Sequence, residues 1–316
     1  VEDAIKKSFP LLTGAFSLVI LTKNKVIGLR DAHGIRPFSI GKLHNDEGFA
    51  ISSETCGLDS INAEYVRDVK PGEMIVIDDM GLHSYQITKE TEERLDIFEF
   101  VYFSRPDSFL YGKSINEIRR EMGRQLAREK KIEADIVVPV PNSAIPAALG
   151  YAEESGIKFD HGLLKNSYIH RTFINPVHVM REKDVKLKLI PMKEILKGKR
   201  VIVIDDSIVR GTTSKKLVHM VRAAGAKEVH LLSASPEVKY PDFYGIATPT
   251  QQELIAAQMS VEEIRKFVGA DTLQYLSYEG LIKATGIPES KFCTSCFTGK
   301  YPIDIGEHAK NINFKV

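Results

Sequence analysis

The sequence predicts an α/β fold: a parallel sheet with helices on both faces, preceded by a smaller α+β region. Three observations lead to this prediction. Strands are expected at residues 136–140, 201–204 and 229–234, and the run at 201–204 lacks a polar face, which is typical of a strand buried on both sides. Helical patterns separate these runs, and this alternation favours right-handed crossovers. Residues 1–90 instead show short strands joined by turns, as antiparallel sheets do.

The elements of the N-terminal region follow from local patterns. Residues 1–12 carry apolar side chains at helical spacing and predict a helix. Residues 14–31 predict a β-hairpin, and further strands are expected at residues 48–52 and 73–78. We therefore expect mostly antiparallel strands through this region.

The elements of the second region alternate between helix and strand. The capping-box sequence at residues 114–117 predicts the start of an amphipathic helix ahead of the first buried strand. Helices are expected at residues 143–154 and from Thr212 onward, each directly after a buried strand. Shorter helices are expected near residues 251–257 and 260–268.

Composition limits the classes of function. The 316 residues are enough for two domains, and 43% hydrophobic with 27% charged residues is ordinary for a globular protein. A net charge of +1 gives no support for nucleic acid or an acidic membrane surface as a partner. No apolar run approaches the length of a membrane span. Three cysteines argue against a secreted disulfide scaffold, so we expect a cytoplasmic protein.

A dense set of polar side chains follows the central apolar run, in the sequence VIVIDDSIVRGTT. Open α/β sheets bind ligands at the carboxyl ends of their strands, so this position favours a binding site. The start of the next helix suits a phosphate, and Gly211 lets the backbone approach it. Asp205 and Asp206 would repel that phosphate, and they suit a divalent cation or sugar hydroxyls. The residues assigned to substrate binding here are Asp205, Asp206, Ser207, Arg210, Gly211, Thr212 and Thr213.

A ribose 5-phosphate with a magnesium-bridged pyrophosphate needs both kinds of partner. The alternative for the same stretch is a capped strand-to-helix turn with two solvated acids.

The string IDDSIVRGTTS resembles the phosphoribosylpyrophosphate (PRPP) signature of type I phosphoribosyltransferases. The wider chain resembles the glutamine PRPP amidotransferase (amidophosphoribosyltransferase) family, from near residue 8 to Pro302. The segments that carry this resemblance include GAFSLVI, RDAHGIRPFSIGK, SSETCGLD, YFSRPDS, VPNSAIPAALGY and KNSYIHRTFINP. It implies a partial N-terminal-nucleophile glutaminase domain over residues 1–95, a type I phosphoribosyltransferase domain over residues 96–285, and a C-terminal tail over residues 286–316.

The resemblance also implies an activity. Members of this family are glycosyltransferases that form 5-phosphoribosylamine and pyrophosphate from PRPP and glutamine-derived ammonia, the first committed step of purine biosynthesis. Magnesium as cofactor, purine nucleotides as feedback inhibitors and a homo-oligomer are implied with it. Two other functions stay open: a non-catalytic module that senses PRPP or nucleotides, and a phosphoribosyltransferase that salvages nucleobases.

The family resemblance assigns roles to three further segments. Asn142 and Ser143 fall in the loop that wraps pyrophosphate, with Ser143 joining Asp205 and Asp206 at magnesium. A helix N-cap is the alternative role for Asn142 and Ser143. In the basic segment KNSYIHRTFINP, Arg171 is the main candidate for the pyrophosphate, with Lys165 and His170 secondary. The residues assigned to catalysis are Lys165, Arg171, Asp205 and Asp206, and those assigned to an ammonia channel are Tyr102, Tyr168 and Ile174.

Cys293 and Cys296 have the CxxC spacing of a metal or cluster pair. Some family members bind a four-iron cluster through this pair and two remote cysteines. The resemblance places Asp96 and Asp242 at those remote positions, so we expect a remnant without a four-iron cluster. A metal site of two cysteines and two aspartates is the alternative. Cys56 is interpreted as a core residue.

The glutaminase nucleophile of the family is an N-terminal cysteine, whereas residue 1 is Val and the first cysteine is Cys56. The resemblance places Val1 inside the glutaminase domain, with about its first half absent. Three explanations stay open: a second chain supplies the rest, the sequence is a fragment, or it is incomplete.

Overall fold

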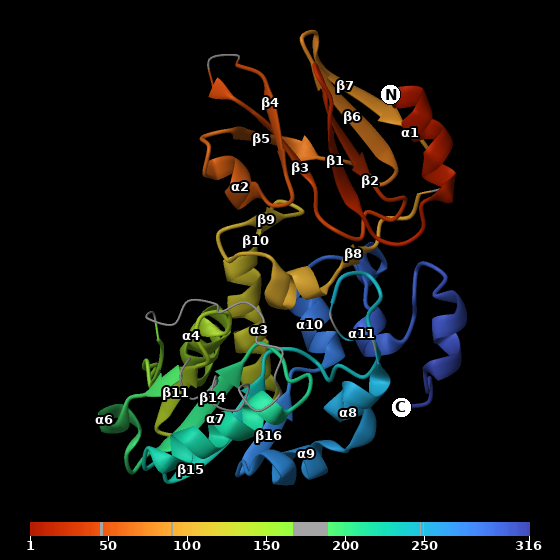
Figure 1. The fold of residues 1–316 in the computed structure, drawn as a ribbon. Coiled ribbons are helices and arrows are strands. Elements are labelled where there is room, and N and C mark those ends of the chain that lie inside the picture. Colours follow the sequence, from red (N-terminus) through yellow and green to blue (C-terminus); the bar gives the residue numbers. More distant parts are fainter. Residues whose placement is uncertain (45–46, 90, 167–188, 247, 249) are drawn as a thin grey trace. The chain divides into compact units, whose positions relative to one another are not determined.

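A computed structural model describes residues 1–316 except residues 45–46, 90, 167–188, 247 and 249 (Figure 1). Contacts divide the chain into two compact units. Unit 1 consists of residues 1–115, 240–249 and 287–314, and unit 2 consists of residues 116–239, 250–286 and 315–316. Most of the predicted C-terminal tail thus belongs to the same unit as the N-terminal region. The domain boundaries given above rest on the family resemblance and stay a prediction.

Unit 1 contains a four-stranded antiparallel sheet in the order β1-β2-β6-β7. Its strands are β1 (Ser17–Leu21), β2 (Val26–Arg30), β6 (Glu73–Asp78) and β7 (Gly81–Gln86). The helix α1 (Glu2–Ser8) and the 3-10 turn η1 (Phe9–Leu11) precede it. Phe9 packs against Ile27, Leu29, Met74 and Val76 in a small core. The predicted N-terminal helix and hairpin are confirmed.

A second antiparallel sheet in unit 1 has the order β4-β3-β5. Its elements are β3 (Ser39–Lys42), β4 (Phe49–Ser52), α2 (Thr55–Asp59) and β5 (Glu64–Asp68). Ile75 of β6 packs with Phe38, Ile40 and Val69 to form its core. Cys56, interpreted as a core residue, lies in α2 and is only half-buried, so that interpretation is wrong.

The rest of unit 1 joins segments that are far apart in the sequence. Strand β8 (Leu95–Asp96) pairs in parallel with β17 (Phe292–Cys293), which brings Asp96 opposite Cys293. A π-helical turn, η3 (Glu99–Phe103), follows β8. The other short elements are β9 (Phe109–Leu110), β10 (Lys113–Ser114), η5 (Glu289–Lys291), α11 (Ser295–Thr298) and η6 (Gly306–Asn311).

Unit 2 is built on a four-stranded sheet in the order β11-β14-β15-β16, with every pairing parallel. Its strands are β11 (Ile136–Pro139), β14 (Arg200–Asp205), β15 (Glu228–Ser233) and β16 (Thr272–Tyr275). Helices α7 (Thr212–Ala223) and α9 (Val261–Val268) pack on one face, where Val201 and Val203 meet Leu217 and Val218 in the main core. The predicted parallel sheet is confirmed, and β16 is a strand that the sequence patterns did not predict.

Helices α3 (Ile115–Glu129) and α4 (Ile145–Ser155) belong to the other face. Neighbouring side chains of a strand point to opposite faces, so Gln274 points away from its core neighbour Leu273, and its Nε2 donates to the Leu126 carbonyl of α3 at 3.0 Å. The two helices touch backbone to backbone, because a Cβ at Gly123 would lie 1.8 Å from the Ala147 carbonyl oxygen. The remaining elements of unit 2 are β12 (Leu163–Lys165), β13 (Leu189–Pro191), α6 (Lys193–Leu196), η4 (Gln251–Glu253), α8 (Ile255–Gln258) and α10 (Tyr278–Thr285).

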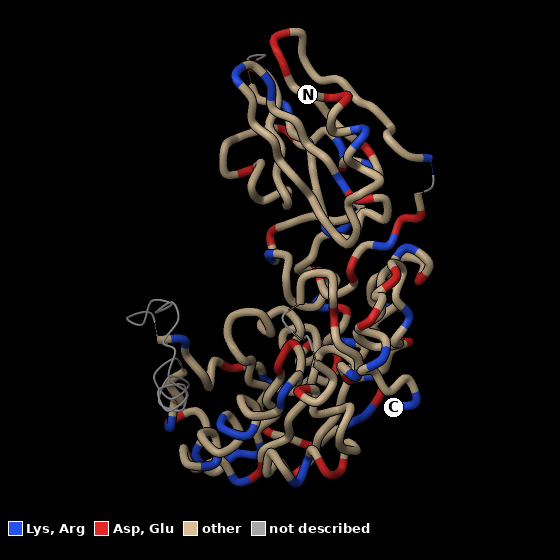
Figure 2. Tube along the Cα trace, turned by 45° about the vertical axis from the view of Figure 1, so that its right-hand side comes forward, with Lys and Arg blue, Asp and Glu red and all other residues tan. Residues whose placement is uncertain are grey.

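Figure 2 shows Lys and Arg interspersed with Asp and Glu along the described parts of both units, in keeping with the net charge of +1. Among the helices of the described residues, none combines the length and apolar character needed to cross a bilayer.

Candidate active site

Two loops meet at the carboxyl end of the parallel sheet of unit 2. One loop follows β11 and contains Asn142 and Ser143; the other follows β14 and contains Asp206. Because β11 and β14 are adjacent parallel strands, both loops leave the same edge of the sheet. The Ser143 hydroxyl donates a hydrogen bond to Asp206 Oδ2 and so joins the loops directly. The peptide bond between Pro141 and Asn142 is cis.

Neither Asn142 nor Ser143 caps the helix that follows. Helix α4 begins at Ile145 with Ala144 as its N-cap residue, and no side chain bonds to the free amides of its first turn. The alternative prediction of an N-cap role is therefore wrong. Ser143 instead directs its hydroxyl at the acid of the neighbouring loop, while Asn142 is exposed at the edge of the site.

The paired acids lie in a poorly solvated place. Asp205 is 8% exposed, and burial, followed by repulsion from Asp206, raises its pKa well above the ordinary value. Burial also raises the pKa of Asp206, while hydrogen bonds from Ser143 and Ser207 and the charge of Arg119 oppose that rise. The prediction of two solvated acids is therefore wrong. A bound cation or a set of hydroxyl donors would relieve the cost of holding both carboxylates ionised.

Arg119 is a contributor that the sequence patterns missed. It lies on α3, is 2% exposed, and its positive charge acts on Asp206. Its position four residues after buried Ile115 and three before buried Met122 puts it on the apolar face of the helix. An arginine on that face is the signal by which it was recognisable, because buried charges need a partner.

The loop from Ser207 to Gly211 leads directly into α7. Gly211 has φ of +71°, a left-handed conformation that favours glycine, and a Cβ there would lie 2.5 Å from Ile255 Cδ1. The amide of Ile255 donates to the Val209 carbonyl at 2.9 Å, so α8 supports the loop. No side chain caps the start of α7, and Thr212 and Thr213 are exposed there. These first-turn amides and hydroxyls suit a phosphate.

The remaining predicted residues make other contacts or fall outside the described residues. The Arg210 guanidinium pairs with the Glu253 carboxylate, with 2.5 Å between Nη2 and Oε2. Lys165 is exposed at the end of β12. Tyr102 lies in η3 of unit 1, is 48% exposed and has its ring 5.9 Å from that of Phe103. The other predicted residues, Tyr168, His170, Arg171 and Ile174, fall outside the described residues.

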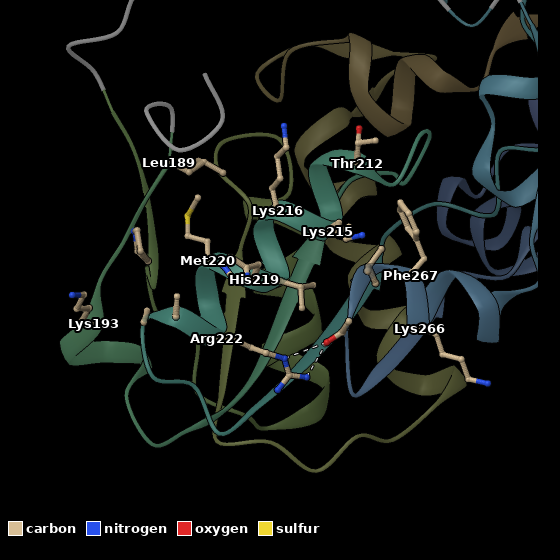
Figure 3. A pocket seen from close by; sticks show the side chains of 16 residues that line it. Leu189, Lys193, Thr212, Lys215, Lys216, His219, Met220, Arg222, Lys266 and Phe267 are labelled. Carbon is tan, nitrogen blue, oxygen red and sulfur yellow. Dashed lines mark hydrogen bonds between the residues drawn. The ribbon is translucent and has the colours of Figure 1, made fainter. Parts of the chain in front are cut away.

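A cavity of about 1270 Å³ lies elsewhere, along the outer surface of α7 (Figure 3). Its lining includes Lys193, Lys216 and Phe267. Of the predicted site residues in the described ranges, only Thr212 contributes to it. The paired acids do not line this cavity, so its size does not identify the reactive site. The reactive site is identified instead by the side chains of the two loops that the bond between Ser143 and Asp206 joins.

The CxxC pair lies in unit 1 and is buried. Burial raises the pKa of Cys293 to about 12 and raises the pKa of Cys296 well above the ordinary value, so both thiols stay protonated at neutral pH. Burial, followed by the charge of Asp242, raises the pKa of Asp96 to about 8, whereas Arg36 opposes that rise. Among the residues that the structure describes, no three His, Cys, Asp or Glu side chains are arranged to hold a metal ion.

Comparison with known proteins agrees with the site geometry. Residues 110–235 match the phosphoribosyl transferase domain family, and this range contains both loops of the site. The chain is 46% identical to the glutamine PRPP amidotransferase of Bacillus subtilis, solved in complex with ADP and GMP. The match has a TM-score of 0.90 and covers 97% of this chain and 68% of that one. The chain belongs to the amidophosphoribosyltransferase family.

Curated members of the amidophosphoribosyltransferase family extend further than this chain. The chain is 49% identical over 312 residues to the amidophosphoribosyltransferase of Synechococcus elongatus, which covers 98% of this chain and 62% of that protein. For the amidophosphoribosyltransferase of Mycobacterium leprae the identity is 47%, covering 98% of this chain and 56% of the relative. The chain therefore spans about three fifths of the length of these relatives. The family resemblance inferred from the motifs is confirmed.

Proposed function

We propose that the chain catalyses the displacement of pyrophosphate from C1 of PRPP by ammonia, which gives 5-phosphoribosylamine. Glutamine would be the source of the ammonia where a glutaminase nucleophile is available. The observation that carries the proposal is the hydrogen bond between Ser143 and Asp206, since it joins a pyrophosphate-type loop to the paired acids of the PRPP signature. This reaction is the first committed step of purine biosynthesis.

The loop after β14 would hold the ribose 5-phosphate. The uncapped first turn of α7 supplies amide donors, and Ser207, Thr212 and Thr213 add hydroxyls. Asp205 and Asp206 stand at the strand end before this loop, where they can accept hydrogen bonds from the ribose hydroxyls. This division of labour explains why two acids and several hydroxyls occur in one short loop.

The site residues also fit magnesium. Ser143, Asp205 and Asp206 supply only oxygen atoms, which are the ligands that magnesium prefers, and magnesium is commonly held by one or two carboxylates together with substrate phosphates. When bound, magnesium would neutralise charge that develops on the departing pyrophosphate. Ser143 would keep Asp206 ionised through its hydrogen bond, and Asn142 would offer its amide to the pyrophosphate.

The chemistry at C1 needs few groups from the protein. The ammonia lone pair forms the new C1–N bond while the C1–O bond breaks. The electron pair of the C1–O bond leaves with pyrophosphate. The attached ammonium then loses one proton to water or phosphate. Uncharged ammonia is already nucleophilic, so no strong general base is required. Arg171, with Lys165 and His170, would neutralise the leaving group, and Tyr102, Tyr168 and Ile174 would line the path of ammonia; these roles stay predictions.

Purine nucleotides are proposed as feedback inhibitors. The Bacillus subtilis relative was solved in complex with ADP and GMP. A nucleoside monophosphate carries the same ribose 5-phosphate group as PRPP, so the loop of Ser207–Gly211 would hold it by the same donors. We expect inhibition by GMP and AMP that PRPP relieves competitively.

Release of pyrophosphate from PRPP tests the proposal against the two other functions. The purified chain is supplied with magnesium, PRPP and one of four additions: glutamine, ammonium chloride, a purine base or buffer. Release that depends on ammonia supports the proposed reaction. Release that depends on adenine, guanine or hypoxanthine would show a salvage enzyme. PRPP binding without release under any condition would favour a sensing module. The variant Asp205→Asn, for which we expect strongly reduced release, serves as the control.

A further inference from the structure

Four chain segments of unit 1 meet around Asp96, outside the site described above. They are the loop before β3, β8 with η3, the segment around Asp242, and β17 with α11. Asp96, Asp242, Cys293 and Cys296 are all at most 4% exposed. The proposed reaction uses none of these side chains. Their burial therefore calls for another explanation.

Some members of the family bind a four-iron cluster at these four positions, and the residues present in this chain do not fit one. Two of the four cluster thiolates are replaced by carboxylates, and both carboxylates already have partners. Asp96 Oδ1 accepts from the Phe98 amide at 3.0 Å, and Asp242 Oδ1 accepts from the Tyr244 and Ile246 amides at 2.8 Å. One oxygen of each carboxylate is therefore already engaged by backbone amides.

A guanidinium also supplies positive charge beside both carboxylates. Arg36 Nη1 donates to Asp96 Oδ2 at 3.1 Å, and its Nη2 lies 3.0 Å from Glu99 Oε1. The same group lies 4.5 Å from the centre of the Phe103 ring. A Cβ added to Gly245 would come within 3.6 Å of the guanidinium carbon, so the segment after Asp242 packs against Arg36 as well. A cation that is planar and hydrogen-bonded on several sides can cross-link these segments.

We propose that Arg36, bonded to Asp96 and Glu99, replaces the metal cluster as the cross-link of this region, so that the site is metal-free. The cluster in a relative would tie together residues from β8, the 242 segment and β17. Here the guanidinium holds β8 and η3, Gly245 packs on it, and the β8–β17 pairing brings in Cys293. The two buried thiols then serve as small apolar side chains. The folded chain consequently needs neither iron nor a reducing atmosphere.

Metal analysis of the unaltered chain is the primary test. The chain is purified without oxygen, and iron, zinc and acid-labile sulfide are measured against protein. The proposal is supported if the protein contains well below one metal ion per chain. The thermal unfolding midpoint should also be unchanged by air and by the chelators EDTA and phenanthroline. One zinc or several irons per chain, or a midpoint that falls on chelation, overturns it. This outcome does not depend on the folding of any variant.

Substitution of the guanidinium supplies the second test. Arg36→Met keeps an unbranched apolar stem and removes the guanidinium that bonds Asp96 and Glu99, which should lower the unfolding midpoint by roughly 5–15 °C. Arg36→Lys keeps the positive charge but lacks the planar set of donors of a guanidinium, so its unfolding midpoint should lie between those of Arg36→Met and the unaltered chain. The control Arg105→Met removes an exposed pair with Asp107 and should change the midpoint by less than about 2 °C.

Each result of this series decides the role of Arg36. A midpoint for Arg36→Met as high as that of Arg105→Met would show that the guanidinium is not the cross-link. If Arg36→Met yields no folded protein while Arg36→Lys folds with a lowered midpoint, the cross-link is supported.

Discussion

The Ser143 hydroxyl donates to the Asp206 carboxylate, although the two residues are 63 positions apart in the sequence. This bond links the loops at the ends of two adjacent parallel strands. It also lowers the cost of ionising Asp206, whose pKa is otherwise raised by burial. A residue of one loop thus favours the ionised form of a residue in the other.

The paired acids should be needed for catalysis and not for folding. Asp205→Asn or Asp206→Asn should lower kcat/KM by roughly 30- to 1000-fold, which corresponds to about 2–4 kcal/mol, because each change removes charge aimed at the reacting centre. The free energy of unfolding should change by no more than about 1 kcal/mol, since Asn keeps the shape and removes a buried charge.

A matched control for this prediction is Asp135→Asn. Asp135 pairs with Arg200, the first residue of β14. Asp135→Asn therefore makes the same chemical change at the opposite end of the sheet. Its kcat/KM should stay within about twofold of the unaltered chain. Full activity of an Asp205→Asn, Asp206→Asn double variant would refute the assignment of both acids.

Loss of the Ser143 hydroxyl should act through Asp206. Ser143→Ala removes a hydrogen bond that lowers the pKa of Asp206, so this pKa should rise further and less carboxylate should be present at neutral pH. We expect a loss in kcat/KM of roughly 5- to 30-fold at pH 7 that shrinks as the pH increases. The measurement is a pH profile of kcat/KM beside that of Ser155→Ala, which alters only the exposed end of α4. An equal loss at every pH would contradict an effect through Asp206.

The reactive loop could largely be predicted from the sequence, because its signals are local. Four apolar residues, two acids and a glycine followed by two threonines specify a buried strand, its end and a helix start. The structure confirms this strand–loop–helix order. The partners of these residues are set by tertiary contacts, so Arg119, which acts on Asp206 from α3, does not appear in any pattern along the loop.

Long-range contacts explain the other misses. Strand β16 contains Gln274, whose polarity weakens a strand pattern, yet its amide bonds a carbonyl of α3 and is buried. The positions of Asp96 and Asp242 followed from aligned motifs, whereas the presence of Arg36 beside Asp96 did not, because 60 residues separate the two. Contacts of this kind depend on which strands become neighbours, and local periodicity carries no information on that.

Gly211 should be required for two reasons that can be separated. Gly211→Ala imposes a left-handed conformation on an L-residue and brings its Cβ into Ile255 Cδ1, so unfolding should become easier by more than about 2 kcal/mol. Gly156→Ala is the control: it has φ of +73° with nothing within 4 Å of a Cβ, and it should cost only about 1–2 kcal/mol of strain.

The contact between Gly211 and Ile255 can be tested by a double variant. Ile255→Val removes the Cδ1 atom and by itself should cost roughly 0.5–1.5 kcal/mol. Combined with Gly211→Ala, it should cost less than the sum of the two single changes, because the clash no longer occurs. Strict additivity in urea unfolding would show that the clash is not the source of the excess cost.

His230 should make unit 2 less stable in acid. The side chain is buried on β15, with Nδ1 3.0 Å from Thr272 Oγ1, and burial lowers its pKa. The neighbouring charges are mixed: Glu228 and Asp271 favour the protonated ring, whereas Arg200 opposes it. In the unfolded chain a histidine has a pKa of about 6.5. The lowered pKa therefore contributes stability that is present above that pH and is lost as the pH falls through the folded-state value.

The contribution of His230 to the pH dependence of stability can be measured by comparing the unaltered chain with a variant. His230→Gln cannot take up the proton, so the difference in unfolding free energy between it and the unaltered chain should depend on pH between about 8 and 5, in favour of the variant as the pH falls. Urea unfolding, with hydrogen exchange at the β15 amides to confine the readout to unit 2, provides the measurement. A difference between His230→Gln and the unaltered chain that is constant over this range would mean that the buried ring does not titrate on unfolding. The acid sensitivity of unit 2 would then have to come from its carboxylates.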